Sequence, residues 1–178
     1  MKTNDALIGF MGTGKTAVGQ LLARKLGLKF IETDALVSSG AGQTIPRIFQ
    51  EGGEIAFREA EIRAVRDAAR ERQTVIACGG GAVLNWINIE RLRETSIIVR
   101  LTAGPAVTLK RVSRAVGQRP LLEVAEPLTR IREMLKFREP FYQRAADVTV
   151  NTSKLDVSDV TDVIMVKLKE DASFDWPK

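Results

Sequence analysis

The sequence predicts an α/β protein in which a parallel β-sheet is covered by helices on both faces. Short apolar segments of strand character alternate with longer segments whose apolar residues recur at helical spacing. A helix between two successive strands returns the chain to the same end of the sheet, so the strands run parallel. The 178 residues contain no internal repeat and suit one domain.

Five strands and seven helices are expected. In chain order they are a strand at 4–10, a helix at 15–26, a strand at 29–32, helices at 44–50 and 54–72, a strand at 73–78, a helix at 87–94, a strand at 96–101, helices at 105–114 and 128–144, a strand at 147–151 and a helix at 157–169. The strands are short apolar runs, as expected where both faces of a sheet are buried. The first helix ends at Gly27, and Ile62, Val65 and Ala69 form the buried stripe of the long helix.

Two segments lack a regular pattern. Residues 113–127 read SRAVGQRPLLEVAEP, with two prolines and a glycine; this composition is typical of a surface loop or of a mobile lid. Residues 171–178 are expected to be a loosely held C-terminal tail. A single domain is therefore expected over 1–170, with a lid at about 113–127.

The composition excludes several classes of function. There is no histidine, which removes a histidine general base and most transition-metal sites. The single cysteine, Cys78, allows no intramolecular disulfide and indicates a cytoplasmic protein. No apolar leader or membrane-spanning run is visible. The net charge of +5 comes from scattered basic residues, with only 6% aromatic residues, so small anions are favoured over nucleic acid as ligands.

One glycine-rich segment carries a complete phosphate-binding pattern. Gly9, Gly14, Lys15 and Thr16 form the spacing Gly-x-x-x-x-Gly-Lys-Thr between an expected strand and an expected helix. Such glycines let backbone N–H groups turn toward phosphate oxygens, and the helix N-terminus adds partial positive charge. The lysine reaches the terminal phosphates, and the threonine hydroxyl is a ligand for Mg²⁺. The alternative is a turn that only caps a helix. We interpret the segment as a site for a nucleoside triphosphate.

The loop alone does not identify the reaction, because motors, GTPases, kinases and nucleotide sensors share it. No Asn-Lys-x-Asp motif of a GTPase follows. In parallel sheets, ligands bind beyond the carboxyl ends of the strands. The expected strands that end near Gly9, Glu32 and Cys78 therefore predict one shared site.

Four further features point to a second substrate at that site. Asp34, after the second strand, is a carboxylate that can accept a hydroxyl proton, or it only caps a helix. Arg58 can grip a carboxylate with both guanidinium nitrogens, although a lone arginine is more often solvated. The run Gly79–Gly80–Gly81 is typical of close backbone approach to a ligand, or of a flexible turn. Arg119 and Arg138 lie in or beyond the irregular segment, where an arginine can close over a phosphoryl group.

Together these motifs resemble the shikimate kinase family. The resemblance runs from about residue 7 to 168 and comprises, in order, GFMGTGKT, FIETD, EGGEIAFRE, CGGG, QRPLL, REPFY and ADVTVNT. It implies a P-loop fold of the nucleoside-monophosphate-kinase type, with three layers and sheet order 2-3-1-4-5. It also implies a monomer that transfers the γ-phosphate of ATP to the 3-hydroxyl of shikimate, on the route to chorismate and the aromatic amino acids.

The resemblance assigns a role to each matching residue. Lys15, Asp34 and Arg119 are expected to be catalytic. The expected contacts of ATP are Gly12, Thr13, Gly14, Lys15, Thr16, Ala17, Arg111, Arg119 and Leu155, with Arg111 stacked on the adenine. Shikimate is expected to contact Asp34, Arg58, Gly79, Gly80, Gly81 and Arg138, within a helical region at about 34–62. Thr16 and, through water, Glu32 are expected to hold Mg²⁺.

One position departs from the family pattern. The family usually has Asp-x-Asp after the second strand, where this sequence has Glu32-Thr33-Asp34. The longer side chain is expected to alter the metal preference without abolishing activity. Three alternatives stay open: a gluconate-type or adenylate-type kinase, a nucleotide-binding regulatory protein without turnover, and a nucleic-acid binder.

Overall fold

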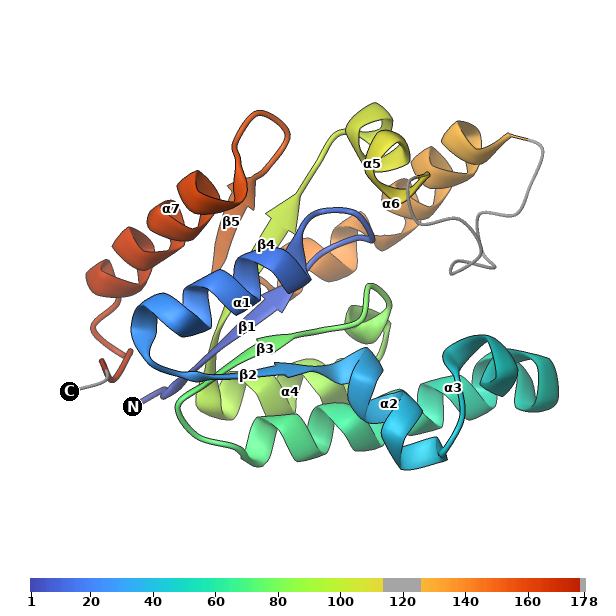
Figure 1. Cartoon of the computed structure of the whole chain (residues 1–178), viewed down its shortest axis with the longest axis horizontal. Helices are drawn as coiled ribbons and strands as arrows, with labels where there is room; N and C mark the ends of the chain where they lie inside the picture. The colour runs from blue at the N-terminus through green and yellow to red at the C-terminus, as the bar shows by residue number, and fades with distance from the viewer. Residues whose placement is uncertain (114–125, 177–178) are drawn as a thin grey trace.

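A computed structural model describes residues 1–113 and 126–176, and this part of the chain contains a five-stranded parallel sheet (Figure 1). The strand order is β2-β3-β1-β4-β5, as predicted. The strands are β1 (Asn4–Ile8), β2 (Lys29–Glu32), β3 (Thr74–Ala77), β4 (Ser96–Thr102) and β5 (Val148–Asn151). Among the described residues, no helix is both long and apolar enough to cross a lipid bilayer.

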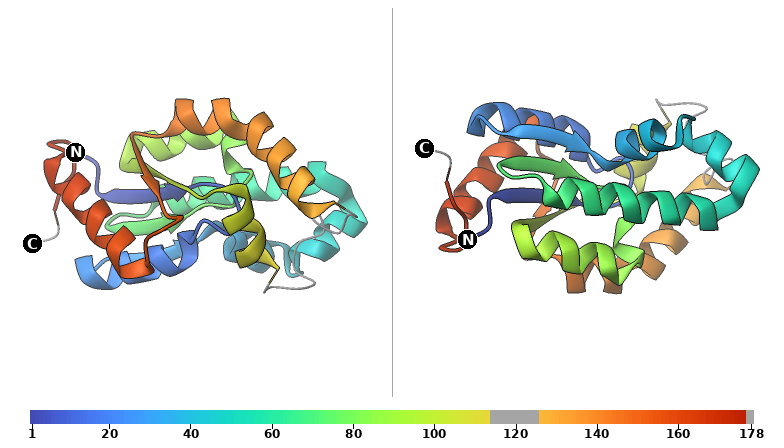
Figure 2. Two further views of the ribbon diagram at one scale, coloured as in Figure 1. Left: turned by 90° about the horizontal axis from the view of Figure 1, so that it is seen from above. Right: turned by 90° about the horizontal axis from the view of Figure 1, so that it is seen from below.

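Helices cover both faces of the sheet and make three layers (Figure 2). The helices are α1 (Lys15–Leu26), α2 (Thr33–Ala41), α3 (Ile45–Arg70), α4 (Trp86–Thr95), α5 (Pro105–Val112), α6 (Pro127–Ala145) and α7 (Val157–Glu170), with a short 3₁₀ turn η1 (Ala82–Leu84). Residues of α1 and α7 pack on one face, and residues of α3, α4 and α6 pack on the other. The strand alternation of β1 explains this: Ala6 and Ile8 contact the second group, and Leu7 contacts the first.

The two helices predicted at 44–50 and 54–72 are confirmed: they meet at a kink and together carry the label α3. Gly53 at the kink has φ 68° and ψ −169°, a conformation that glycine tolerates. Before α3, Thr33–Ala41 forms α2, which was not predicted as a separate element. The tail is not loosely held over 171–176. Phe174 is buried in the core, and Lys2 exchanges backbone hydrogen bonds of 2.8 Å with Ser173 and Asp175.

Asp5 is an ionisable group inside the core. It lies in the central strand β1 and is fully buried. Within residues 1–113 and 126–176, neither of its carboxylate oxygens has a hydrogen-bond partner. Burial raises the pKa of the Asp5 carboxyl to about 8. The side chain is therefore mainly protonated at neutral pH, because a buried charge without a partner is costly.

Candidate active site

The glycine-rich loop is held in shape by its own side chains. It joins β1 to α1, and Gly14 caps α1 with φ 98°, a left-handed conformation that favours glycine. The buried Thr13 hydroxyl donates to Phe10 O at 2.8 Å. Lys15 Nζ donates to the carbonyl oxygens of Gly9 at 2.8 Å and Phe10 at 2.9 Å. The lysine ammonium therefore lies across the loop, where it can meet a phosphate.

A carboxylate from β2 reaches the mouth of this loop. Glu32 ends β2, and Glu32 Oε1 accepts a hydrogen bond of 2.5 Å from the hydroxyl of Thr16, in the first turn of α1. The described residues contain no group of three or more histidine, cysteine, aspartate or glutamate side chains suited to a metal ion. The pair provides two adjacent oxygen groups, of the kind that Mg²⁺ binds together with water and phosphate.

Asp34 and Thr33 connect the start of α2 to the glycine turn. The Thr33 hydroxyl is buried and accepts a hydrogen bond of 2.9 Å from the backbone N–H of Gly79. A Cβ atom at Gly79 would lie 2.6 Å from Asp34 Oδ1 and 3.0 Å from Glu61 Oε1. The turn therefore requires glycine here because its backbone approaches two carboxylates closely.

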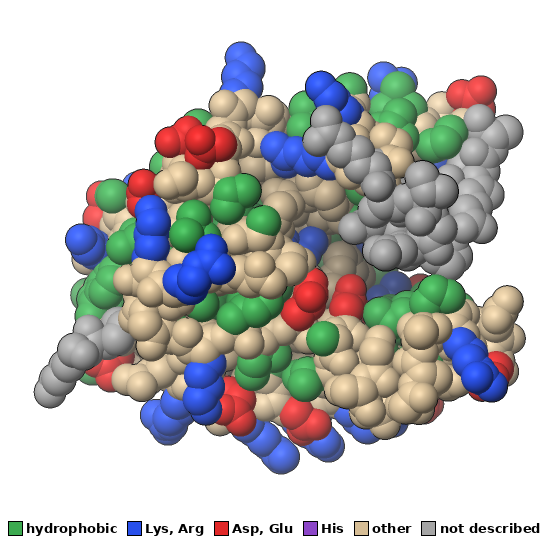
Figure 3. All heavy atoms as spheres, in the orientation of Figure 1, with side chains coloured by type: hydrophobic (Ala, Val, Ile, Leu, Met, Phe, Trp, Pro, Cys, Tyr) green, Lys and Arg blue, Asp and Glu red, His purple; other side chains and the backbone are tan. Residues whose placement is uncertain are grey.

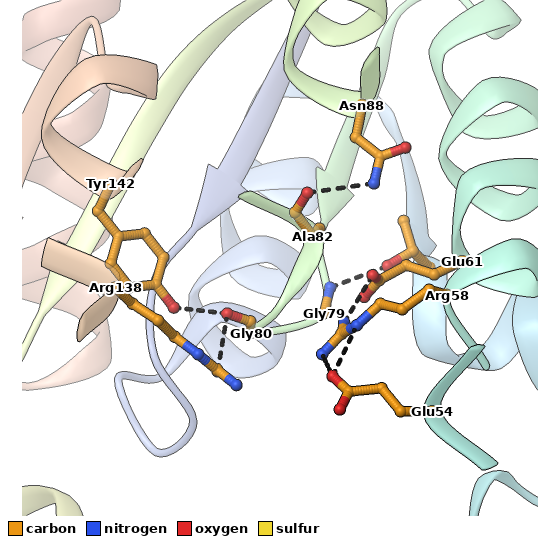
Figure 4. A network of polar contacts seen from close by, with 10 residues as sticks. Glu54, Arg58, Glu61, Gly79, Gly80, Ala82, Asn88, Arg138 and Tyr142 are labelled. Atoms are coloured by element: carbon orange, nitrogen blue, oxygen red, sulfur yellow. Dashed lines mark hydrogen bonds and ion pairs between the residues drawn. The ribbon is translucent and has the colours of Figure 1, made fainter. Parts of the chain in front are cut away.

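Arg58 is held between two glutamates of its own helix, α3 (Figure 4). Its Nη1 lies 2.7 Å from Glu61 Oε2, and its Nη2 lies 3.0 Å from Glu54 Oε1. Glu61 is 1% exposed, and burial raises the pKa of its carboxyl while the nearby Arg58 opposes that rise. A Cβ atom at Gly81 would lie only 2.3 Å from Arg58 Nη1. Glu61 and Gly81 therefore confine the guanidinium from two sides.

Arg138 approaches the same turn from the opposite side, on α6 (Figure 4). Gly80 O accepts hydrogen bonds from Arg138 Nη1 at 3.2 Å and from the Tyr142 hydroxyl at 2.6 Å. Burial raises the pKa of Tyr142 to about 12, so its hydroxyl keeps its proton and stays a donor. The Arg138 guanidinium also stacks over the Phe10 ring, 5.6 Å from its centre. The three glycines thus lie between two arginines.

These groups surround a cavity of about 630 Å³. Its lining residues are Met11, Glu32, Asp34, Ala35, Ser38, Thr44, Ile45, Pro46, Phe49, Phe57, Arg58, Glu61, Gly79, Gly80, Gly81 and Arg138. Figure 3 shows this face of the molecule hollowed near its centre, with acidic side chains beside the hollow and basic ones within it. Two arginines and a neighbouring carboxylate suit a small ligand that carries both an anionic group and hydroxyl groups.

Of the nucleotide contacts predicted outside the glycine-rich loop, Arg111 touches the loop directly. Arg111 in α5 donates to Gly12 O at 3.2 Å, to Thr152 Oγ1 at 2.9 Å and to Thr152 O at 2.7 Å. It therefore ties the glycine-rich loop to the end of β5. Leu155, in the segment after β5, is exposed. Stacking of Arg111 on adenine stays a prediction, and Arg119 lies outside the described residues.

Comparison with known proteins agrees with this arrangement. The model of the shikimate kinase family matches residues 11–169. The chain belongs to the shikimate kinase family. A shikimate kinase of Caldanaerobacter subterraneus subsp. tengcongensis is 46% identical over 93% of this chain and 98% of its own length. One from Symbiobacterium thermophilum is 45% identical over 94% and 97%.

Structures of shikimate kinases share the fold over nearly the full length. The enzyme of Acinetobacter baumannii, solved in complex with shikimate, has a TM-score of 0.90 at 34% identity and covers 97% of each chain. Membership of the shikimate kinase family makes the protein an ATP-dependent kinase.

The predicted second-substrate residues within the described part of the chain line one cavity, and Glu32 joins them. Sequence reasoning missed Glu61 and Tyr142. The signal for Glu61 was its position three residues after Arg58, on the same face of a helix. Tyr142 likewise follows Arg138 by four residues. Neither spacing shows that these two side chains lie beside the glycine turn at 79–81, which belongs to a different part of the chain.

Proposed function

We propose that the chain transfers the γ-phosphate of ATP to the 3-hydroxyl of shikimate, giving shikimate 3-phosphate and ADP. The observation that carries this proposal is the cavity in which Arg58, Arg138 and Asp34 meet around the glycine turn, beside the glycine-rich loop. Membership of the shikimate kinase family and the bound shikimate in the Acinetobacter baumannii relative support the same acceptor.

Each group has a role that follows from its charge and position. Arg58 and Arg138 grip the carboxylate of shikimate, since guanidinium groups bind carboxylates with paired hydrogen bonds. Asp34 orients the acceptor hydroxyl and takes its proton. Lys15, with the backbone N–H groups of 12–17, neutralises the charge on the transferred phosphoryl group. Most of the rate enhancement then comes from positioning and electrostatic stabilisation.

Magnesium is part of this proposal. Thr16 and Glu32 would hold it, because a hydroxyl and a carboxylate already lie 2.5 Å apart at the mouth of the loop. Bound Mg²⁺ would supply positive charge at the β- and γ-phosphates.

Further expectations stay predictions from the sequence. They are a monomeric state, a cytoplasmic location, the domain limits 1–170, the substrate-binding region 34–62, and a lid at 113–127 that carries Arg119. Most of that lid lies outside the described residues.

Two variants test the assignment. Asp34→Asn and Arg58→Ala should each abolish shikimate phosphorylation, measured as ADP release, while calorimetry shows that ADP still binds. A loss of nucleotide binding equal to the loss of activity would contradict these roles. If the wild-type chain binds ATP but does not turn over with shikimate, it is a nucleotide-binding protein without this activity.

A further inference from the structure

A partly buried ion pair joins α6 to strand β4 of the sheet. Arg100 in β4 donates to Glu139 in α6 through both terminal nitrogens, Nη1 to Oε1 at 2.9 Å and Nη2 to Oε2 at 2.6 Å. Arg100 is only 8% exposed. In the sheet it pairs with Ile8, the residue before the glycine-rich loop begins at Gly9. The pair therefore fastens α6 to the part of the sheet that supports the nucleotide loop.

Glu139 is next to the arginine that faces the cavity. A single turn of α6 carries Arg138 and Tyr142, which both donate to Gly80 O, and Glu139, which accepts from Arg100. The Arg100 guanidinium also lies 5.2 Å from the centre of the Tyr142 ring. Gln143 donates to Glu139 Oε1 at 2.9 Å. The hydrogen bond from Arg100 holds the pKa of Glu139 below its ordinary value, so Glu139 is charged at neutral pH.

The same turn of α6 is weakened by a proline. Pro140 lies inside the helix and has no N–H with which to bond the carbonyl four residues earlier. A helix with a missing backbone bond is less rigid at that point. The orientation of Arg138, two residues before the proline, therefore depends on contacts with the sheet.

We propose that Arg100 and Glu139 are positioning residues for the substrate clamp: their two-point ion pair fixes the rotation of α6 and thereby aims Arg138 at the cavity. Partly exposed ion pairs add little net stability. A planar arginine fork bonded to both carboxylate oxygens, in contrast, strongly defines geometry. The inference rests on the proposed function, because it requires Arg138 to bind the acceptor.

The test compares Glu139→Gln with a matched control, Asp162→Asn. Asp162 in α7 also pairs with a cation from another element, Lys25 Nζ at 2.5 Å, on the side of the sheet covered by α1 and α7. Steady-state kinetics with each substrate varied would be measured for both variants, with melting temperatures. In Glu139→Gln, KM for shikimate should rise on the order of tenfold, with kcat and KM for ATP unchanged. Asp162→Asn should leave all three constants unchanged.

A second variant separates geometry from charge. Arg100→Lys keeps the positive charge but lacks the planar fork, so KM for shikimate should rise, though less than in Glu139→Gln. An unchanged KM for shikimate in Glu139→Gln would overturn the proposal. So would equal increases in both KM values together with a lower melting temperature, because that pattern indicates a purely structural role. If the wild type does not turn over with shikimate at all, the proposed function has failed first.

Discussion

Replacing Gly81 with alanine should displace the Arg58 guanidinium without disturbing the fold. The new Cβ would lie 2.3 Å from Arg58 Nη1, 2.6 Å from Nη2 and 2.8 Å from Cζ. Ordinary non-bonded contacts lie at about 3.5–4.0 Å, so the guanidinium must retreat by roughly 1 Å. Gly81 itself has φ −101° and ψ −2°, which alanine adopts readily. The strain therefore falls on a flexible side chain and not on the backbone.

A misplacement of this size should reduce kcat/KM for shikimate by about tenfold to a hundredfold. The assay is coupled ADP release at saturating MgATP with shikimate varied. Gly40→Ala is the control, because a Cβ atom there meets nothing within 4 Å. Wild-type kinetics in Gly81→Ala would refute the close packing of Arg58 against the turn. A similar loss in Gly40→Ala would show that the effect is not local.

Two other variants test the packing of Gly79 against Asp34 and the protonation of the buried Asp5. Gly79→Ala should lower kcat more than it raises KM for shikimate, since its Cβ would lie 2.6 Å from Asp34 Oδ1; steady-state kinetics would show this, and a selective rise in KM would contradict it. Asp5→Asn should remove a pH dependence of stability. The folded chain keeps a proton at Asp5 up to about pH 8, whereas the unfolded chain releases it near pH 3.8. Wild-type stability therefore falls by about 1.4 kcal/mol per pH unit across this window as the pH rises. Urea unfolding of both proteins at two pH values within it should reveal the difference, and parallel pH profiles would contradict the prediction.

The sequence predicts best the features that local chemistry determines. The bounds of α1 match the prediction because Gly14 and Gly27 both adopt left-handed conformations at its ends. The common location of Glu32 and the glycine turn follows from parallel strands ending at one edge. By contrast, α2 reads VSSGA over its second half, a composition that favours turns as much as helices. Its packing against α3 is a tertiary contact.

The partners of buried polar groups could not be predicted. Arg100 and Glu139 are 39 residues apart, and Tyr142 lies 62 residues from Gly80. The number of residues between two positions does not show whether their side chains meet in the folded chain. The three glycines illustrate the same limit. The sequence indicates close backbone approach to a ligand, whereas the structure shows that Gly79 and Gly81 leave room for the protein's own Asp34, Glu61 and Arg58.

The most direct test of the central claim is ADP release from MgATP, measured with shikimate and, separately, with gluconate and with AMP. We expect turnover that depends on shikimate and is absent with either control. Comparable turnover with gluconate or AMP, or nucleotide binding without shikimate-dependent turnover, would contradict the assignment of the cavity to shikimate.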